Sequence, residues 1–453
     1  KNKFVVHEGV VFTNTSEAPI DMLVFRLFPN SFGEDVAKVH NVESHRGIAY
    51  QVFQGLLRVK LKQRLQMGDR IRLFIHYEAQ IPEMPVTHGI PEQMNATHTG
   101  AFGHWGDSVN LGFWLPLLTH FDGEAFDQRP IPPNGEHAWH DPATFHVTLE
   151  VPEDLTVATT GIKLAESVEE GRKTAIYVAH GVREFAVHGA VGFENVETKV
   201  GETTVRVFFA PGDEQGAKEI LKAGAAALGF YNESFGLYRH SELDIVRAKV
   251  NVALGTEYPG LVTISTAAPL GLETEWTTAH EVAHQWWYGE VGNDSRDAPW
   301  IDEALASYSA AMYLEHAHDE KLMQEGLRGG LKEAYGAMFA AKIDDRPANL
   351  PSEKYNLSEY GIIVYGRAAI FFDEMREELG REAFLASIKK YYSSNIGKSV
   401  TEEALLQAFR ENAESPEKVD QLYQRWIVEA NGFEDVLGKS AGKVRKFREE
   451  LEK

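Results

Sequence analysis

The sequence predicts an α+β protein with two domains: an N-terminal β-sheet domain over residues 1–209 and a mainly helical domain with a small sheet over residues 210–453. The chain has 453 residues, more than one hydrophobic core usually accommodates, so two to three domains are expected. Strand-like segments fill about the first 200 residues. Helical apolar spacing begins just after Pro211, which places the boundary near residue 210.

Five segments of the N-terminal part are predicted strands because they are rich in Val, Ile, Phe and Thr, partly alternate, and end at turn-forming residues. These segments are KFVVHEGVVFTNT (3–15), IRLFIHYEA (71–79), ATFHVTLEVP (143–152), TAIYVAHG (174–181) and TTVRVFFAPG (203–212). Together they indicate a domain made of β-sheet.

The second domain is predicted to open with a helix and a small sheet. In DEQGAKEILKAGAAALGFYNESFG (213–236), the apolar residues recur at helical spacing. They include Ala217, Ile220, Leu221, Ala225 and Leu228. LDIVRAKVNVALG (243–255) and GLVTIST (260–266) are predicted to contain strands, and nearly all of the chain after Glu273 is predicted to be helical.

The charge and composition exclude several classes of partner. Lys and Arg number 45 against 67 Asp and Glu, which gives a net charge of −22. Such a chain repels phosphate backbones and anionic membranes and favours cationic ligands, including the protonated amino ends of peptides. We therefore expect no nucleic-acid partner. The absence of cysteine excludes disulfides and thiolate metal sites, and no apolar run reaches the roughly 18 residues of a membrane span.

The chain begins KNKFVVHEGV, with neither an initiator Met nor a charged-then-apolar signal pattern. We expect it to start after a removed segment, such as a signal or lipid-anchoring sequence. This expectation favours an extracellular or cell-envelope location over a cytoplasmic one. The sequence carries no signal for oligomeric state.

The stretch TTAHEVAHQWWYGE (277–290) places His280 and His284 four residues apart, with Glu281 between them. On an α-helix, residues i and i+4 lie one above the other, so both imidazoles can reach one ion. Glu281 sits about 100° round the helix from His280, beside such an ion. This H-E-x-x-H arrangement supplies two zinc ligands and an acid/base carboxylate. Two histidines that share a helical face without a metal are the alternative.

A catalytic zinc needs a third protein ligand and an open position for water. The segment DAPWIDEALASYSAAMYLEHA (297–317) predicts a helix that can supply this ligand, with Asp297 as its cap and Pro299 in its first turn. Its predicted apolar stripe consists of Ile301, Ala304, Leu305, Tyr308 and Met312. Asp302 and Glu303 are the acidic candidates, and they point about 100° apart, so at most one is expected to reach the ion. A solvated helix carboxylate is the alternative for either.

The longer stretch HEVAHQWWYGEVGNDSRDAPWIDEALASY (280–308) resembles the signature of the zinc aminopeptidases related to aminopeptidase N. That family carries H-E-x-x-H, eighteen intervening residues, and then Glu in a W-L-x-E-like context, and the match includes the two tryptophans that follow His284. The resemblance implies His280, His284 and Glu303 as the zinc ligands. It leaves Asp302 as a neighbour that could support a histidine.

A second matching segment is VALGTEYPGLVTIS (252–265), whose Tyr-Pro-Gly run predicts a tight turn beside an extended stretch. The family carries G-x-M-E-N or G-G-M-E-Y-P here, and its Glu binds the free α-amine of the substrate. The resemblance assigns this role to Glu257, with Gly255 beside it. Thr256 replaces the usual Met and Leu254 replaces a common Gly, so the first substrate pocket is expected to differ in shape. A solvated turn carboxylate is the alternative for Glu257.

A third segment, LSEYGIIVYGRAAIFFDEMREELG (357–380), predicts one long helix. The family has a Y-E-K-G-A-like segment whose Tyr donates a hydrogen bond to the developing oxyanion. YGRAA resembles it and assigns that role to Tyr365, although Gly366, Arg367 and Ala368 differ from the common Glu, Lys and Gly. Tyr360 is the candidate for a supporting role.

The resemblance implies a saddle-like N-terminal β-sheet domain and a thermolysin-like catalytic domain that holds one Zn²⁺ per chain, in a short form without the large C-terminal helical domain. It implies a zinc-dependent aminopeptidase that acts on peptides with a free N-terminus, with Glu281 as general acid/base. The alternatives are a thermolysin-like zinc endopeptidase and a non-catalytic peptide-binding module. The preferred N-terminal residue and the physiological substrate have no signal in the sequence.

Overall fold

The structure is a computed structural model that describes residues 2–33, 35–84, 100–132, 139–250 and 253–451. The described residues form two compact units. The first unit holds those within 1–132, 137–194 and 249–253, and the second holds those within 195–248 and 254–453. The boundary predicted at residues 209/210 lies later than this division, because residues 195–209 contribute strands to the sheet of the second unit.

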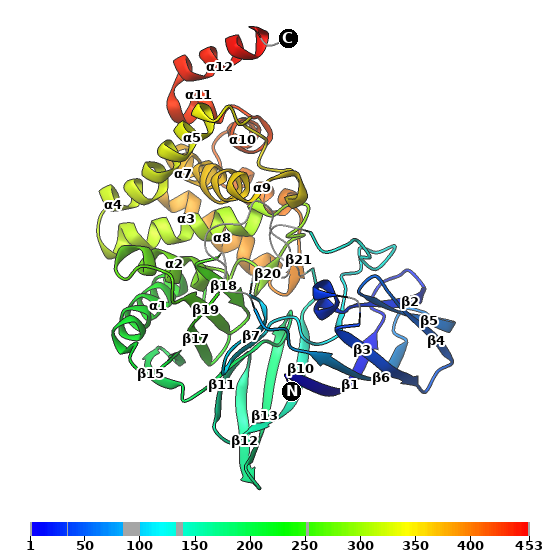
Figure 1. Cartoon of the computed structure of the whole chain (residues 1–453). Coiled ribbons are helices and arrows are strands. Elements are labelled where there is room, and N and C mark those ends of the chain that lie inside the picture. Colours follow the sequence, from blue (N-terminus) through cyan, green and yellow to red (C-terminus); the bar gives the residue numbers. More distant parts are fainter. Residues whose placement is uncertain (1, 34, 85–99, 133–138, 251–252, 452–453) are drawn as a thin grey trace. The chain divides into compact units, whose positions relative to one another are not determined.

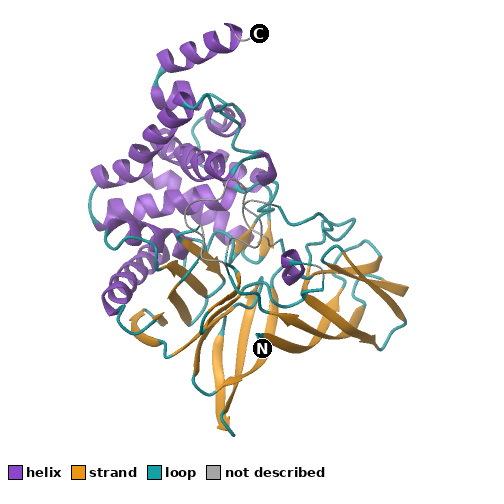
Figure 2. Cartoon of the chain, in the orientation of Figure 1, coloured by secondary structure: helices purple, strands orange, loops and turns teal. Residues whose placement is uncertain are grey.

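The first unit is made mostly of strands (Figure 2). Its described residues contain four antiparallel sheets. In spatial order the sheets are β1 (Lys3–Thr13), β6 (Arg70–Gln80) and β3 (Ala37–Ser44); β4 (Ile48–Phe53), β5 (Leu56–Leu65), β2 (Ile20–Arg26) and β9 (Leu117–Leu118); β10 (Ala143–Pro152), β13 (Arg172–Val182) and β12 (Ile162–Glu169); and β11 (Leu155–Thr159), β14 (Val187–Val191), β8 (Ser108–Leu111) and β7 (Phe102–Trp105). A 3-10 helix, η1 (Phe28–Phe32), lies between β2 and β3 in the chain. Exposed and less exposed residues alternate along β6, which explains why the sequence pattern located it.

The second unit opens with a five-stranded mixed sheet of order β15 (Glu194–Val200), β16 (Thr203–Phe209), β17 (Glu242–Ala248), β19 (Leu261–Ser265) and β18 (Gly255–Tyr258). Helix α1 (Glu214–Ser234) connects the parallel strands β16 and β17, as a parallel pair requires. Strand β18 runs antiparallel to β19 and is the last strand of the sheet in the described chain. The predicted helix and small sheet are therefore present.

Helices make up most of the remaining chain (Figure 1). They are α2 (Leu272–Ala283), α3 (Trp300–Ala317), α4 (Glu320–Gln324), α5 (Gly330–Ala340), α6 (Leu357–Glu359), α7 (Ala368–Leu379), α8 (Arg381–Asn395), α9 (Glu402–Arg410), α10 (Pro416–Tyr423), α11 (Gly432–Leu437) and α12 (Lys439–Leu451). Shorter elements are the π-helical η2 (Glu325–Gly329), η4 (Tyr360–Arg367) and η5 (Gln424–Val428), the 3-10 helix η3 (Ser352–Lys354), and the parallel pair β20 (Val291–Gly292) and β21 (Lys398–Ser399). Among the described residues, no helix is long and apolar enough to cross a membrane.

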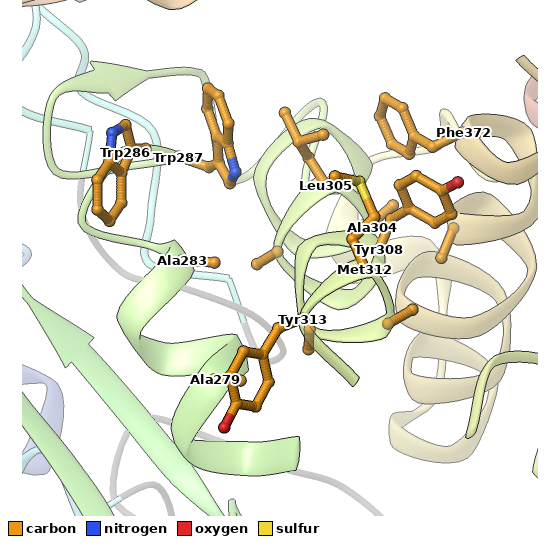
Figure 3. Packing of buried hydrophobic residues seen from close by; sticks show 14 of the residues in the cluster. Ala279, Ala283, Trp286, Trp287, Ala304, Leu305, Tyr308, Met312, Tyr313 and Phe372 are labelled. Atoms are coloured by element: carbon orange, nitrogen blue, oxygen red, sulfur yellow. The ribbon is translucent and has the colours of Figure 1, made fainter. Parts of the chain in front are cut away.

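Helix α3 is the central helix of the second unit. Every residue from Trp300 to Leu314 is buried, so the predicted apolar stripe is only part of a helix surrounded on all sides. Figure 3 shows Leu305, Tyr308 and Met312 of this helix packed among aromatic side chains. Because this stretch is enclosed, its two acidic residues, Asp302 and Glu303, are held in a water-poor setting.

The start of α3 differs from the predicted cap. Pro299 occupies the N-cap position rather than the first turn, and Asp297 does not cap the helix. The preceding turn is organised by Asp294, whose Oδ1 accepts hydrogen bonds from the backbone N–H groups of Arg296 and Asp297 at 3.2 Å each. An Asp side chain often accepts hydrogen bonds from the backbone N–H groups two and three residues later in a loop. The sequence pattern of such a turn resembles that of a helix cap, so the sequence did not distinguish the two.

Candidate active site and metal centre

Three predicted ligands converge at the contact of α2 and α3. His280 Nε2 and His284 Nε2 are 3.1 Å apart, and each lies 3.3 Å from Oε2 of Glu303. Donor atoms about 2.0–2.1 Å from a tetrahedral Zn²⁺ lie roughly 3.3 Å from one another. All three side chains are buried. The three atoms therefore have the spacing of one face of a zinc coordination tetrahedron, with the fourth position left for water or substrate.

The imidazole rings are oriented by contacts on their far sides. Nδ1 of His284 is 2.9 Å from the carbonyl oxygen of Trp287, which makes Nδ1 the protonated nitrogen and leaves the Nε2 lone pair for a metal. Nδ1 of His280 lies 3.4 Å from Oγ of Ser307. The indole N–H of Trp287 in turn donates to Oγ of Ser309 at 3.0 Å, so α3 holds the segment that holds His284. The ring of Trp287 lies beside α3 in Figure 3.

The acidic neighbours on α3 take different positions. Only Glu303 belongs to the three-residue cluster with the two histidines. Burial by itself would raise the pKa of Glu303, but hydrogen bonds from His280 and His284 outweigh it and lower the pKa to about 2. Glu303 is therefore ionised at neutral pH, as a zinc ligand must be. Oδ1 of Asp302 instead accepts a hydrogen bond from the backbone N–H of Glu303 at 3.0 Å, and burial followed by the Glu303 charge raises its pKa to about 8.

Glu281 lies beside the cluster as the H-E-x-x-H geometry predicts. It is buried, and its Oε2 has no hydrogen-bond partner within the described part of the chain. Burial, and then the charge of Glu257, raise the pKa of Glu281 well above its usual range. Gly255 is required for this placement, because a Cβ at that position would overlap the Glu281 carboxylate. The carboxylate thus lies directly over the backbone of β18, and Gly255 acts by leaving space.

Glu257 lies on the edge strand β18, paired in register with Val262 of β19. A carboxylate oxygen of Glu257, one of Glu281 and a ring nitrogen of His284 lie within 4.8 Å of one another. Burial raises the pKa of Glu257 to about 7, the positive charge of His284 opposes this shift, and Glu303 adds to it. Glu257 as a whole residue is partly exposed, although its carboxyl group is buried.

Gln285, which follows the C-terminal end of α2, is hydrogen-bonded to the β18–β19 turn. Oε1 of Gln285 accepts from the backbone N–H of Gly260 at 2.7 Å, and its side-chain amide donates to the carbonyl of Tyr258 at 3.1 Å. These bonds fix the edge strand relative to His284, the residue directly before Gln285. Sequence reasoning did not assign a role to Gln285, Ser307 or Ser309, because nothing distinguishes them from other polar residues until the chain is folded.

Tyr365 reaches the cluster from the π-helical η4. Its hydroxyl donates to Oε1 of Glu303, and its ring stacks on His280 with centroids 5.6 Å apart. The ring of Tyr360 lies edge-on to Tyr365 at 5.7 Å, and its hydroxyl has no hydrogen-bond partner in the described residues. Burial, followed by the Glu303 charge, raises the pKa of both phenols well above the usual range, so both stay protonated donors. The segment predicted as one long helix is helical throughout, but it changes from α to π and back.

A His-His-Glu cluster at the contact of α2 and α3, with a carboxylate and a tyrosine beside it, is the arrangement typical of a zinc metallopeptidase site. Residues 220–426 match the Peptidase family M1 domain, and this match, together with the relatives and solved structures below, supports an aminopeptidase N-family zinc peptidase. Aminopeptidase M1-B of Oryza sativa subsp. japonica is 26% identical over 382 residues, which cover 80% of this chain and 42% of that protein. Aminopeptidase M1 of Arabidopsis thaliana is 26% identical over 365 residues, which cover 74% of this chain and 39% of that protein. The chain thus spans less than half the length of these relatives.

Solved structures share the fold over nearly the whole chain. The M1 zinc metallopeptidase from Deinococcus radiodurans aligns with a TM-score of 0.70 at 18% identity, over 95% of this chain and 90% of that one. A mutant two-domain M1 zinc metallopeptidase, bound to L-tryptophan, gives a TM-score of 0.69 at 18% identity, over 95% of this chain and 91% of that one. The predicted fold class, a β-sheet domain followed by a helical metallopeptidase domain, is confirmed. The family also implies zinc as the cofactor.

Replacing His284 with Ala is expected to remove most of the bound zinc, because two remaining ligands hold the ion far more weakly than three. The measurement is zinc per chain by elemental analysis after dialysis. His318→Ala is the matched control, since His318 pairs with Glu275 outside the cluster and should leave the zinc content unchanged. Full zinc occupancy in His284→Ala would contradict the ligand assignment.

Proposed function

We propose that the chain is a zinc-dependent aminopeptidase that removes N-terminal residues from peptides with a free amine. The observation that carries the proposal is the position of Glu257, a partly exposed residue whose carboxylate lies within 4.8 Å of a ring nitrogen of His284. Glu257 is not needed to complete the set of three metal ligands. Its carboxylate is therefore free to bind a positively charged group of the substrate, one residue away from the peptide bond that is cleaved at the metal. A peptide's α-amine, with a reference pKa of about 8, is that cation near neutral pH.

The edge strand supports a peptide as the substrate. Strand β18 pairs on one side with β19 and is the last strand of its sheet in the described chain. An extended peptide can add to such an edge through main-chain hydrogen bonds. Glu257 lies on this strand, so the same strand that pairs with the substrate backbone carries the carboxylate that holds its amine. The two contacts together fix which peptide bond lies over the cluster.

The remaining side chains have the chemistry that peptide hydrolysis needs. Zinc, when bound, supplies a Lewis acid and makes water a nucleophile at neutral pH. The Glu281 carboxylate takes a proton from the attacking water and delivers it to the leaving nitrogen. The Tyr365 hydroxyl, now directed at Glu303, is in reach to donate to the oxygen that becomes negative during attack. Glu257 positions the substrate, and Gly255 leaves the space in which the acid/base Glu281 lies. Neither of these two residues exchanges a proton in the reaction.

One zinc ion per chain is proposed. Among the described residues, the two groups of possible metal ligands are His280, His284 and Glu303, and Glu257, Glu281 and His284. They share His284, whose Nδ1 is occupied by the Trp287 carbonyl, so this imidazole can bind only one ion through Nε2. The first group has the 3.1–3.3 Å spacing of a tetrahedral face, which favours it as the site.

Glu257→Ala is expected to lower kcat/KM for free-amine substrates by about 10- to 10²-fold, the value of a hydrogen bond between charged groups. It should also reduce discrimination against N-acetylated substrates, because the carboxylate that disfavours them is gone. The measurement is the ratio of kcat/KM for the free and acetylated forms of one peptide, in wild type and variant. Glu257→Gln, which keeps the shape without the charge, separates electrostatics from packing.

An unchanged ratio in both Glu257 variants, with zinc still bound, would mean that Glu257 does not read the amine. The zinc endopeptidase alternative would then be favoured, because cleavage would not depend on a free N-terminus. A non-catalytic binding module is disfavoured by the coexistence of the complete ligand group with Glu281 and Tyr365 beside it.

A further inference from the structure

The position of Tyr365 depends on the π-helical pitch of η4. In an α-helix, residues five apart are rotated by about 140° from one another. In η4, the rings of Tyr360 and Tyr365 are instead neighbours, with centroids 5.7 Å apart. A π-helical segment is rare and less stable than the α-helix on either side of it, so it needs support from outside. Relaxation of η4 to α-helical pitch would turn Tyr365 relative to Tyr360 and away from the metal cluster.

The C-terminal end of η4 is held by the buried guanidinium of Arg367. Its NH1 donates to Oδ2 of Asp345 at 3.0 Å and to the carbonyl of Glu429 at 3.1 Å, and its NH2 donates to the carbonyl of Arg346 at 2.7 Å. The side chains of Arg367 and Asp345 are only 1% and 3% exposed. The desolvation of such a pair offsets most of its attraction, so stability alone is a weak reason for its presence.

The N-terminal end of η4 is contacted by the segment formed by Asp345 and Arg346, whose two residues also bind Arg367. Glu359 directly precedes η4 and forms a capping box with Asn356, with hydrogen bonds of 2.9 Å in both directions. Oε1 of Glu359 also accepts from Nε of Arg346 at 3.4 Å. Asp345 and Arg346 therefore contact Glu359, the residue directly before η4, and Arg367, the last residue of η4.

The segment that holds η4 is itself fixed. Besides Arg367, Asp345 accepts hydrogen bonds from the Tyr335 hydroxyl of α5 at 2.9 Å and from the backbone N–H of Gly432 at 2.6 Å. Helix α5 also packs closely on η4, because a Cβ at Gly366 would come within 2.9 Å of Leu331. The carboxylate of Asp345 thus joins η4, α5 and the start of α11.

We propose that Asp345 and Arg346 clamp the two ends of η4, and that Arg367 is a positioning residue that fixes the pitch of η4 and so directs the Tyr365 hydroxyl at the metal cluster. The clamp acts through Tyr365 and does not touch substrate or metal, so the inference rests on the proposed role of Tyr365 in the reaction. Under this proposal, three residues contribute to turnover and not to folding alone: Arg367, Asp345 and Arg346.

The test is a double-mutant cycle between Arg367→Lys and Tyr365→Phe. Lysine keeps the positive charge, but it lacks the planar guanidinium group with which arginine donates hydrogen bonds to Asp345 and to two backbone carbonyl groups at once. In the wild-type background, Arg367→Lys should lower kcat by about 10- to 10²-fold, the range expected when a catalytic group is displaced by up to ~1 Å. KM and zinc content should stay close to wild type. In the Tyr365→Phe background, the same change should lower kcat no further, because no hydroxyl is left to misplace.

The control is Arg376→Lys on α7, a matched change in a pair joined by two hydrogen bonds to Glu315 of α3, and it should leave kcat unchanged. Equal losses from Arg367→Lys in both backgrounds, or no loss in either, would overturn the clamp while leaving the proposed function intact. Wild-type kcat in Tyr365→Phe alone would overturn the role of Tyr365 and the clamp together. Should Arg367→Lys fold poorly, Asp345→Asn carries the same expectations, since it weakens the bond to Arg367 and keeps its shape.

Discussion

Glu281→Gln is expected to retain zinc and to lose at least about 10² in kcat, and up to about 10⁴, the range for a positioned general acid/base. The amide keeps the size of the side chain in the narrow space over Gly255, so the fold and the metal ligands are left in place. What it loses is the ability to accept a proton from water and release it to the leaving nitrogen. The measurement combines steady-state kcat on a free-amine substrate with zinc content.

Glu275→Gln is the matched control, because Glu275 lies on the same helix α2 and pairs with Tyr313 and His318 away from the cluster. It should keep wild-type kcat. If Glu281→Gln turned over at a near-normal rate with zinc bound, Glu281 would not be the acid/base, and Glu257 would be the next carboxylate to test.

Tyr365→Phe is expected to lower kcat by about 10²–10³ with a smaller change in KM, as for the loss of one oxyanion donor. The ring, with its stacking on His280, is retained, so the geometry of the histidine should not change. Tyr238→Phe provides the comparison, since it also removes one hydroxyl hydrogen bond, to the carbonyl of Glu242, outside the site. An effect of Tyr365→Phe on KM alone would assign the residue to substrate packing.

Much of the fold could be predicted because its signals are local. The strand ATFHVTLEVP is β10 with the same bounds, since alternation and turn residues mark both of its ends. The pairing of β10 with β13 and the order of the five-stranded sheet are contacts between distant residues, and no single segment encodes them. The burial of Trp300–Leu314 on all sides of α3 was not predicted for a related reason: Asp302, Glu303, Ser307 and Ser309 are polar residues, and their surroundings in the folded chain are not visible in the sequence.

The candidate site also contains residues that could be predicted from local sequence and residues that could not. The His280–His284 pair follows from helical geometry alone, because i and i+4 share a face. The choice of Glu303 over Asp302 depended on the family resemblance, and the contacts of the folded chain now support it. Tyr365 is one of 16 tyrosines, and neither its approach to the cluster nor the π-helical pitch that directs it has a physical signal in the sequence.

The most direct measurement of the central claim is product analysis of one free-amine peptide of about six to eight residues, incubated with the zinc-loaded protein and sampled over time by mass spectrometry. Under the proposed role of Glu257, its carboxylate holds the α-amine one residue from the cleaved bond, so the products should be single amino acids and a ladder of peptides shortened from the N-terminus. The acetylated peptide and the metal-stripped protein should give little product. Internal fragments as the first products, formed equally from the acetylated peptide, would contradict the aminopeptidase assignment.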